Sequence, residues 1–439
     1  MAPIRVSLTS VLRPDRDRSP QHGSASGGDF VLDAINSHCF NDQMGQCAPT
    51  GSPGDLLDLI RRRRPITRAG LASITGLARS TITQRVDQLI VKGLVSEVGE
   101  AASTGGRPAT MLGFNAMSGV VLVADLGATH SRLAVCDLDA NPLAETSRDI
   151  DIADGPDEVL SWVDKTFGAL TEEAGRSPAD VRGIGIGVPG SVDFVAGRAV
   201  HPSRMPGWDG YPIRERFIER YGVPVLVDND VNIMALGEFW AMDPGVDDFV
   251  FVKVGTGIGS GLILGGHLHR GARGAAGDIG HIQAGSADVM CRCGNPGCLE
   301  ASAGGAALAR SLRAQGYDAA DSRDVVAFVK AGNGDAIHAV RDAGRLIGGV
   351  LASTVNILNP AVISIGGDIA EAGQQLLAGI REIVYQRSTA LSTNDLQITT
   401  GMLGDRAGII GAAALIIEHI FDPETINAGF VAAGDGGGS

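Results

Sequence analysis

The chain has 439 residues, 44% of them hydrophobic, which is enough for two or three domains with substantial cores. No apolar run reaches the roughly 18 residues of a membrane span, and the N-terminus lacks the apolar stretch of a secretory signal, so we expect a cytoplasmic protein. The formal net charge of −14 argues against a protein that coats nucleic acid along its whole surface. Six cysteines in so long a chain argue against a disulfide scaffold.

Residues 1–52 form the first segment, which is rich in Ser, Gly, Asp, Arg and Pro and has no sustained hydrophobic periodicity. Such a composition cannot offset the entropy of ordering by burial, so we expect a disordered tail and assign it no function. The sequence GDLLDLIRRRR then begins a helical pattern with Leu56, Leu59 and Ile60 on one face. Its run of four arginines, residues 61–64, fits either a solvated helix end or part of a basic surface.

Residues 53–116 are expected to form a winged helix-turn-helix module that binds DNA. The segment TRAGLASITGLARSTITQRVDQLIVKGLV contains two short helical patterns joined at Gly76. Its apolar residues supply a candidate core of Ala69, Leu71, Ile74, Leu77, Ile82, Val86, Leu89 and Ile90. Ser80 can cap the second helix. The exposed face of that helix would present to a major groove Arg79, Ser80, Thr81, Thr83, Gln84 and Arg85.

The wing is expected from VSEVGEAASTGGRPATMLGFN, which has the pattern of a hairpin with STGGRP at its tip. Arg107, between Gly106 and Pro108, could enter a narrow minor groove, where A·T-rich sequence concentrates negative potential. Residues 53–110 carry nine Lys or Arg and five acidic residues, so a basic module is joined to an acidic remainder. A three-helix protein-docking unit is the alternative, but the helix-turn-helix, the wing and the local positive charge together favour DNA.

Residues 117–430 have a different pattern, in which apolar strands end in glycine turns: GVVLVADLGATH, VRGIGIGVPGSVD, VPVLVDND, DFVFVKVGTGIGSG and NPAVISIGGD. These strands alternate with helical stretches such as LLAGIREIVYQR, which indicates an α/β architecture. Polar ligands usually bind at such strand ends in α/β sheets. We find no internal repeat of fixed period, and residues 431–439 are expected to be a flexible tail.

A metal site is predicted in GDIGHIQAGSADVMCRCGNPGCLE, residues 277–300. His281, Cys291, Cys293 and Cys298 offer one imidazole and three thiolates, the usual ligand set of a closed, tetrahedral structural zinc site. Three reduced thiols in a glycine loop beside an unrelated histidine are the alternative. The spacing Cys-x-Cys-Gly-x-x-Gly-Cys has little reason to arise from packing, so it favours zinc.

The same run, with its Gly-x-x-Gly-Asp-Ile-Gly-His lead, resembles the ROK family of repressors and sugar kinases, and the resemblance extends over residues 54–420. It implies an actin-like, ribonuclease-H-like sugar-kinase fold whose two lobes enclose a sugar cleft. It also implies a nucleotide site, for ATP with Mg²⁺, built from Asp125, Gly127, Thr129, Gly255, Thr256, Gly257, Gly259, Gly366 and Gly367. Glycines let backbone N–H groups approach phosphate oxygens, although each loop alone could equally be a strand-ending turn.

The resemblance further implies a sugar site. Asn229 would hydrogen-bond sugar hydroxyls, and Asp230 would be the general base if the chain is an active kinase. His281 would contact the sugar with one ring nitrogen while the other binds zinc, so that the metal supports the sugar site. Glu300 would accept further hydroxyls. Without the resemblance, Asp230 could be a turn-capping residue.

Two positions depart from the pattern of the family's kinases. Arg204 stands where they usually carry Asn, and Asp278 stands where they usually carry Glu. Arginine only donates hydrogen bonds and aspartate is one methylene shorter, so the set of hydroxyls that the site recognises should differ from that of a plain glucose site. Arg204 would suit a ligand with a carboxylate or phosphate; the alternative is that it points to solvent.

Two functions fit these features. The first is a repressor of carbohydrate metabolism that binds an inverted-repeat operator as a homodimer or homotetramer and responds to a sugar or sugar derivative. The second is an ATP-dependent sugar kinase, hexokinase-like or glucokinase-like, with an accessory DNA-binding module. The winged module favours the repressor. Structural zinc is expected in both cases, and ATP with Mg²⁺ would be needed only by an active kinase.

Overall fold

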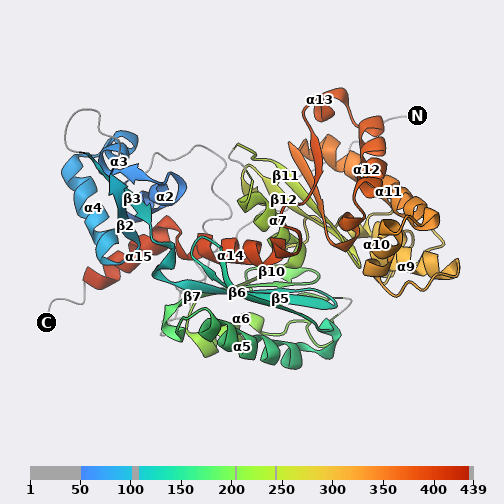
Figure 1. Cartoon of the computed structure of the whole chain (residues 1–439), viewed down its shortest axis with the longest axis horizontal. Coiled ribbons are helices and arrows are strands. Elements are labelled where there is room, and N and C mark those ends of the chain that lie inside the picture. The colour runs from blue at the N-terminus through green and yellow to red at the C-terminus, as the bar shows by residue number, and fades with distance from the viewer. Residues whose placement is uncertain (1–50, 101–107, 203–204, 243–244, 435–439) are drawn as a thin grey trace, which may run out of the picture. The chain divides into compact units, whose positions relative to one another are not determined.

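The computed structural model describes residues 51–100, 108–202, 205–242 and 245–434 (Figure 1). Arg107 at the wing tip and Arg204 lie outside these residues, as does nearly all of the N-terminal segment expected to be disordered. None of the described helices is both long and apolar enough to cross a membrane. Short 3-10 helices occur at η1 (Ala116–Ser118), η2 (Ile152–Asp154), η3 (Pro178–Asp180), η4 (Ile279–His281), η5 (Asp368–Ala372) and η6 (Gly404–Arg406).

The N-terminal elements are three helices and a small sheet. They are α2 (Pro53–Arg62), β1 (Ile66–Thr67), α3 (Arg68–Thr75), α4 (Arg79–Val91), β2 (Val95–Glu100) and β3 (Thr110–Phe114). Ser52 caps α2 in a reciprocal capping box with Asp55, and Gly76 ends α3 in the left-handed conformation, with φ of 70°. The strands pair antiparallel in the order β1-β3-β2, so the expected helix-turn-helix is followed by the two strands of a wing.

Three expectations for this module were wrong. The N-cap of α4 is Ala78, which has no side-chain cap, so Ser80 lies inside the first turn. Ala69 is exposed and Ile74 is 38% exposed, because Leu71 is the residue that the short helix α3 buries. Arg85 is half-buried, and its guanidinium donates to the carbonyl of Gly51, so it does not face outward from α4.

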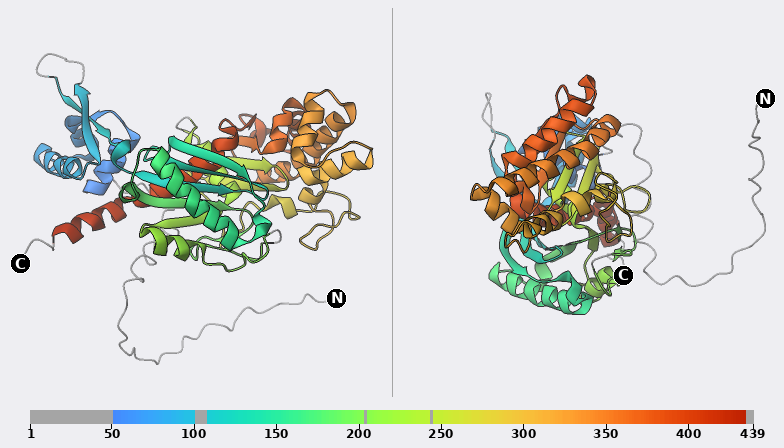
Figure 2. Two further views of the ribbon diagram at one scale, coloured as in Figure 1. Left: turned by 60° about the horizontal axis from the view of Figure 1, so that its bottom comes forward. Right: turned by 90° about the vertical axis from the view of Figure 1, so that its right-hand side faces the viewer.

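The first lobe contains a five-stranded sheet in the order β10-β7-β4-β5-β6. Its strands are β4 (Val120–Leu126), β5 (His130–Asp137), β6 (Pro142–Asp149), β7 (Val181–Val188) and β10 (Val225–Asn229), with a small hairpin of β8 (Val192–Asp193) and β9 (Arg198–Ala199). Helices α5 (Pro156–Glu173) and α6 (Ile213–Tyr221) cover one face of this sheet (Figure 2). Strand alternation explains the layers, because Leu122 packs toward these helices and Val121 and Val123 pack on the opposite face.

The second lobe has a sheet in the order β13-β12-β11-β14-β15. Its strands are β11 (Phe249–Val254), β12 (Ile258–Leu264), β13 (His267–Leu268), β14 (Val362–Gly366) and β15 (Gln397–Thr400). Its helices are α8 (Leu299–Ala303), α9 (Gly305–Ala314), α10 (Ser322–Lys330), α11 (Gly334–Leu358), α12 (Gln374–Arg387) and α13 (Ala390–Thr393). Both sheets combine three antiparallel strands with two parallel ones, a duplicated topology that has no fixed period in the sequence.

Two helices lie between the sheets. α14 (Ala407–Ile420) packs on β4 and β7, and α7 (Asp230–Trp240) packs on β11 and β12 (Figure 1). The two helices cross closely, since a Cβ built on Gly411 would lie 1.6 Å from the carbonyl oxygen of Ile233. After α14 the chain continues into α15 (Pro423–Gly434), which contacts α2 of the N-terminal module.

The module and the first lobe share one hydrophobic cluster. Arg61 of α2 is buried, lies 3.2 Å from Glu418 of α14 and stacks over the ring of Phe421. The backbone N–H of Gly54 donates to Asn427 of α15 at 2.9 Å. The arginine run is therefore no uniform solvated helix end, because its first member is an interior contact between the module and α14.

Candidate functional site

A cleft of about 890 Å³ opens where strands of both sheets end. It is lined by every described residue that was predicted for sugar or nucleotide binding: Asp125, Gly127, Thr129, Asn229, Asp230, Gly255, Thr256, Gly257, Gly259, Asp278, His281, Glu300, Gly366 and Gly367. Residues up to 242 positions apart in the chain thus meet at one place, as expected for ligand sites at the strand ends of α/β sheets. Their individual roles stay predictions.

The two predicted phosphate loops follow β4 and β11. Asp125 is the next-to-last residue of strand β4, and its Oδ1 is buried without a hydrogen-bond partner among the described residues. Burial raises the pKa of Asp125 to about 6, with the charge of Asp230 adding to this effect and Lys253 opposing it. In the second loop a Cβ at Gly257 would meet Glu300 Oε2, so a larger residue there would displace the carboxylate of Glu300.

Asn229 and Asp230 stand at the start of α7. Asn229 is the N-cap: its Oδ1 accepts from the backbone N–H groups of Val231 and Asn232, and its Nδ2 donates to Gly190 O and to Asp230 Oδ1. The capping function considered for Asp230 therefore belongs to Asn229. Asp230 is buried and lines the cleft from the first residue of the helix.

Lys253 in β11 was not predicted. Its ammonium lies 2.7 Å from Asp230 Oδ2, and both residues line the cleft. Burial lowers the pKa of Lys253, but the carboxylates of Asp230 and Asp125 outweigh burial and raise that pKa above its usual value. A lysine inside the apolar run DFVFVKVG, directly before a glycine loop, was the sequence signal for it.

The predicted sugar side of the cleft is formed by the segment that leads into the cysteine cluster. His281 ends η4, and its Nε2 lies 4.0 Å from Asp278 Oδ1 on the cleft side. Burial raises the pKa of Asp278, an effect that His281 opposes. Glu300 lies in the first turn of α8, and its Oε2 accepts from the backbone N–H of Ile258 at 3.4 Å. Both carboxylates can accept hydrogen bonds from hydroxyls, and His281 Nε2 would donate one if Nδ1 binds zinc.

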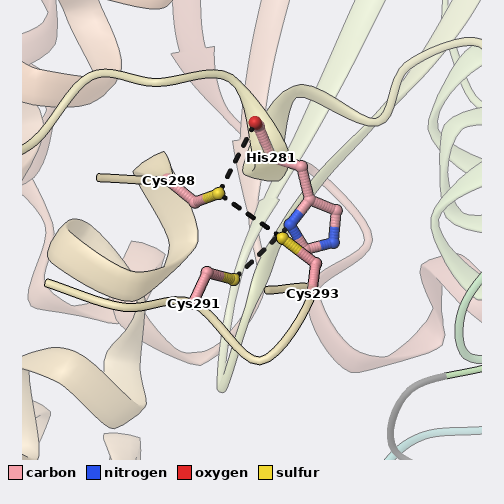
Figure 3. Close-up of side chains that lie close together, drawn as sticks. All are labelled: His281, Cys291, Cys293 and Cys298. Atoms are coloured by element: carbon pink, nitrogen blue, oxygen red, sulfur yellow. Dashed lines mark hydrogen bonds between the residues drawn. The ribbon is translucent and has the colours of Figure 1, made fainter. Parts of the chain in front are cut away.

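The four predicted metal ligands converge (Figure 3). The ligand atoms of His281, Cys291, Cys293 and Cys298 all lie within 4.8 Å of one another. The distances from Cys291 Sγ to His281 Nδ1 and from Cys293 Sγ to Cys298 Sγ are both 3.6 Å. Zinc–ligand bonds of about 2.0–2.3 Å in a tetrahedron place neighbouring ligand atoms about 3.5–3.8 Å apart, so the set fits zinc. Nδ1 faces the sulfurs while Nε2 faces Asp278. This orientation is compatible with the prediction that one ring nitrogen of His281 binds zinc and the other contacts the sugar.

The outer face of α4 carries most of the residues predicted to contact DNA. Arg79, Ser80, Thr83 and Gln84 are exposed, whereas Thr81 is half-buried. The positive charge of the module is smaller than a count of its sequence indicates, because Arg61 and Arg64 pair with Glu418 and Asp139, two carboxylates outside the module. Arg63 and Arg79 have no ion-pair partner in the described part of the chain, and Arg79 stands at the N-terminus of α4.

Comparison with known proteins places the chain in a family. A family model described as ROK family matches residues 121–419. A putative xylose repressor of Caldicellulosiruptor sp. (strain Rt8B.4) is 31% identical over 379 residues, which cover 83% of this chain and 95% of that protein. The crystal structure of a ROK family transcriptional regulator, a homologue of the E. coli MLC protein, is similar with a TM-score of 0.72 and 27% identity, covering 85% of this chain and 97% of that one.

A ROK family glucokinase from Streptomyces griseus, in complex with glucose and AMPPNP, is similar with a TM-score of 0.60 and 27% identity. It covers 68% of this chain and 99% of its own. The family model spans more than half of the chain, and the two-lobed α/β architecture agrees with these solved structures. The fold predicted from the sequence is thereby confirmed, and the chain belongs to the ROK family.

Proposed function

We propose that this chain is a sugar-responsive transcriptional repressor of carbohydrate metabolism. The observation that carries the proposal is the combination of a winged helix-turn-helix module and a sugar-type cleft in one chain, with buried contacts between the module and α14. The repressor and regulator relatives support it, because they match 83% and 85% of the chain, more than the two lobes alone can supply. The glucokinase structure matches 68%.

DNA binding would use α4 as the recognition helix. Its exposed side chains include a guanidinium, two hydroxyls and an amide, from Arg79, Ser80, Thr83 and Gln84, which are the groups that contact phosphates and base edges. One such helix contacts too few bases for useful specificity, so we expect a two-fold homo-oligomer on an inverted repeat. Arg107 at the wing would add a minor-groove contact.

The effector is proposed to be an uncharged sugar. Among the described residues, the cleft is lined by eight Asp or Glu residues and three Lys or Arg residues, and two of these cations already pair with lining carboxylates, in Lys253–Asp230 and Arg132–Asp405. A phosphate or carboxylate ligand would meet repulsion in such a site, whereas hydroxyls find many acceptors. This charge pattern speaks against the anionic ligand that Arg204 suggested in the sequence.

Zinc is proposed at His281, Cys291, Cys293 and Cys298 as a structural ion. When bound, it would close the loop between η4 and α8 and hold the imidazole of His281 in one orientation. The sugar-facing Nε2 would then be fixed beside Asp278, which lowers the entropy lost when sugar binds.

An ATP-dependent sugar kinase is the second candidate. One observation favours it, namely that Asp125 and both glycine loops line the same cleft as Asp230. We rank it second, and we propose that any phosphoryl transfer is weak.

A thermal-shift screen tests the effector and the repressor together. Neutral pentoses and hexoses, starting with D-xylose, are compared with their phosphate esters, since a ligand at 100 times its Kd stabilises by about 2.7 kcal/mol. Electrophoretic shifts on an operator selected from random DNA are then measured with and without the best sugar. Stabilisation by phosphate esters alone would contradict the neutral effector. DNA affinity that no stabilising sugar changes would contradict a sugar-responsive repressor.

A further inference from the structure

The position of Lys253 follows from strand alternation. Phe249, Phe251 and Lys253 share one face of β11, and the two phenylalanines pack against α7. The partners of Lys253 on both neighbouring strands are glycines, Gly259 in β12 and Gly366 in β14. The lysine therefore has room to extend along the sheet surface toward the first residue of α7, which is Asp230.

The hydrogen bonds of Asp230 leave one place for a ligand. Its Oδ1 accepts from the backbone N–H of Val231 at 3.0 Å and from Asn229 Nδ2 at 3.1 Å, and its Oδ2 accepts from Lys253 Nζ at 2.7 Å. A carboxylate has about four lone-pair sites, so one site on Oδ2 remains. The Lys253 ammonium has three N–H donors, and Asp230 is its one hydrogen-bond partner among the described residues.

Lys253 and Asp230 thus place a charged donor and a charged acceptor side by side in the cleft wall. We propose that the pair is a single hydroxyl-binding element: Asp230 Oδ2 accepts from one sugar hydroxyl, and the Lys253 ammonium donates to the adjacent hydroxyl oxygen. The ligand class that fits is an uncharged sugar with a vicinal diol. This inference rests on the proposed sugar-binding function, and it makes Lys253 a specificity-determining residue of that site.

A second ion pair supplies a matched control. Asp228, two residues before Asp230, is 2% exposed and lies 2.7 Å from Arg270 Nε. This pair joins β10 to a segment of the second lobe, whereas Lys253–Asp230 joins β11 to α7; the two pairs have the same length, but neither Asp228 nor Arg270 lines the cleft. Loss of either pair should weaken the contact between the lobes, whereas only Lys253 should affect sugar contacts directly.

The experiment compares the full chain with Lys253→Met, Asp230→Asn, the double variant and Arg270→Met. Affinity for D-xylose, or for the sugar that gives the largest thermal shift, is measured by calorimetry. Lys253→Met should weaken binding at least about tenfold, as expected for a hydrogen bond from a charged group. The sugar affinity of the double variant should be at most about threefold lower than that of Asp230→Asn, because the two residues act as one element. Arg270→Met should bind sugar within about threefold of wild type.

Three results would overturn the proposal. The first is a sugar affinity of Lys253→Met within twofold of wild type. The second is a loss of affinity in the double variant equal to the product of the losses in the two single variants, and the third is an equal loss of affinity in Lys253→Met and Arg270→Met. If no sugar binds the wild-type protein, the proposed effector function fails first, and the ion pair is tested by melting temperature. Each single variant leaves a buried charge unpaired, so the double variant should melt no lower than the less stable single variant. Additive losses of melting temperature would refute the pairing itself.

Discussion

Arg61→Ala is the most direct test of how the winged module is joined to the sugar-binding lobes. The Arg61 side chain is 7% exposed, and its guanidinium lies 4.9 Å from the ring centroid of Phe421 and 5.6 Å from that of Phe114. A buried cation over aromatic rings contributes about 0.5–2 kcal/mol. Its ion pair with Glu418, which is half-exposed, adds about 1 kcal/mol or less. Removal should therefore cost the contact with α14 about 2 kcal/mol.

The expected result is a loss of sugar response. Sugar bound in the cleft can change DNA affinity only through contacts that join the lobes to the module, and a typical coupling is about 1–3 kcal/mol, or 5–150-fold. A loss of about 2 kcal/mol in these contacts could reduce the effect of sugar on operator affinity by a factor of about 30. The assay is operator affinity by fluorescence anisotropy with and without saturating sugar.

Arg62→Ala is the matched control, because it removes the same positive charge from the same helix. Arg62 is 67% exposed, and its ion pair with Asp58 one turn earlier contributes about 0.3–0.5 kcal/mol. Sugar response should fall sharply in Arg61→Ala and stay near wild type in Arg62→Ala. Equal responses in the two variants would refute this contact as the coupling route.

Three further predictions concern the metal, the DNA face and a buried carboxylate. Cys293→Ser should bind no zinc, measured by elemental analysis beside the wild type, and should bind sugar more weakly because the zinc ion no longer orients His281. Full zinc content with unchanged sugar affinity would contradict this prediction. Gln84→Ala should relax base preference, whereas Arg107→Ala should weaken binding most on sites with A·T-rich flanks; equal loss on every sequence for Gln84→Ala would exclude it from base contacts. Asp125→Asn should raise the melting temperature at pH 7.5 and have little effect near pH 4. With a folded-state pKa of about 6, ionisation of Asp125 destabilises the folded protein as pH rises from about 4 to 6, and asparagine removes this effect. The same gain in melting temperature at both pH values would contradict the raised pKa.

Sequence correctly predicted the α/β class and that residues with a fixed local chemistry come together, in the cysteine–histidine cluster and in the cleft. Three cysteines and a histidine have few reasons to cluster besides metal, and glycine turns after apolar strands indicate ligand loops whatever the packing around them. The strand pattern gave the α/β class, and the ROK resemblance gave the two lobes. Neither needed knowledge of which segments meet in space.

The features that sequence missed depend on contacts distant in the chain. Arg61 has the local pattern of a helix-end arginine, yet it is buried because α14, more than 350 residues later, supplies Glu418. Ile74 fits a helical core pattern but is 38% exposed, since α3 packs through Leu71. Lys253 could have been noticed as a charge in an apolar strand, but its partner Asp230 became evident only once α7 was placed against β11.

The last prediction concerns phosphoryl transfer. A sugar kinase needs a carboxylate that accepts the proton of the attacking hydroxyl, and we propose Asp230 for this role because it lines the cleft. Here three donors, including the Lys253 ammonium at 2.7 Å, already hold that carboxylate in one orientation. A displacement of about 1 Å in a reacting group can cost on the order of 100-fold in rate, so a cleft that binds sugar well can transfer phosphate very slowly. We therefore expect sugar binding with weak or absent ATP-dependent phosphorylation, measured by coupled ADP release across a sugar panel beside Asp230→Asn. Turnover of about 1–100 s⁻¹, the range of typical kinases, that Asp230→Asn abolishes would show that the chain is an enzyme that also binds DNA.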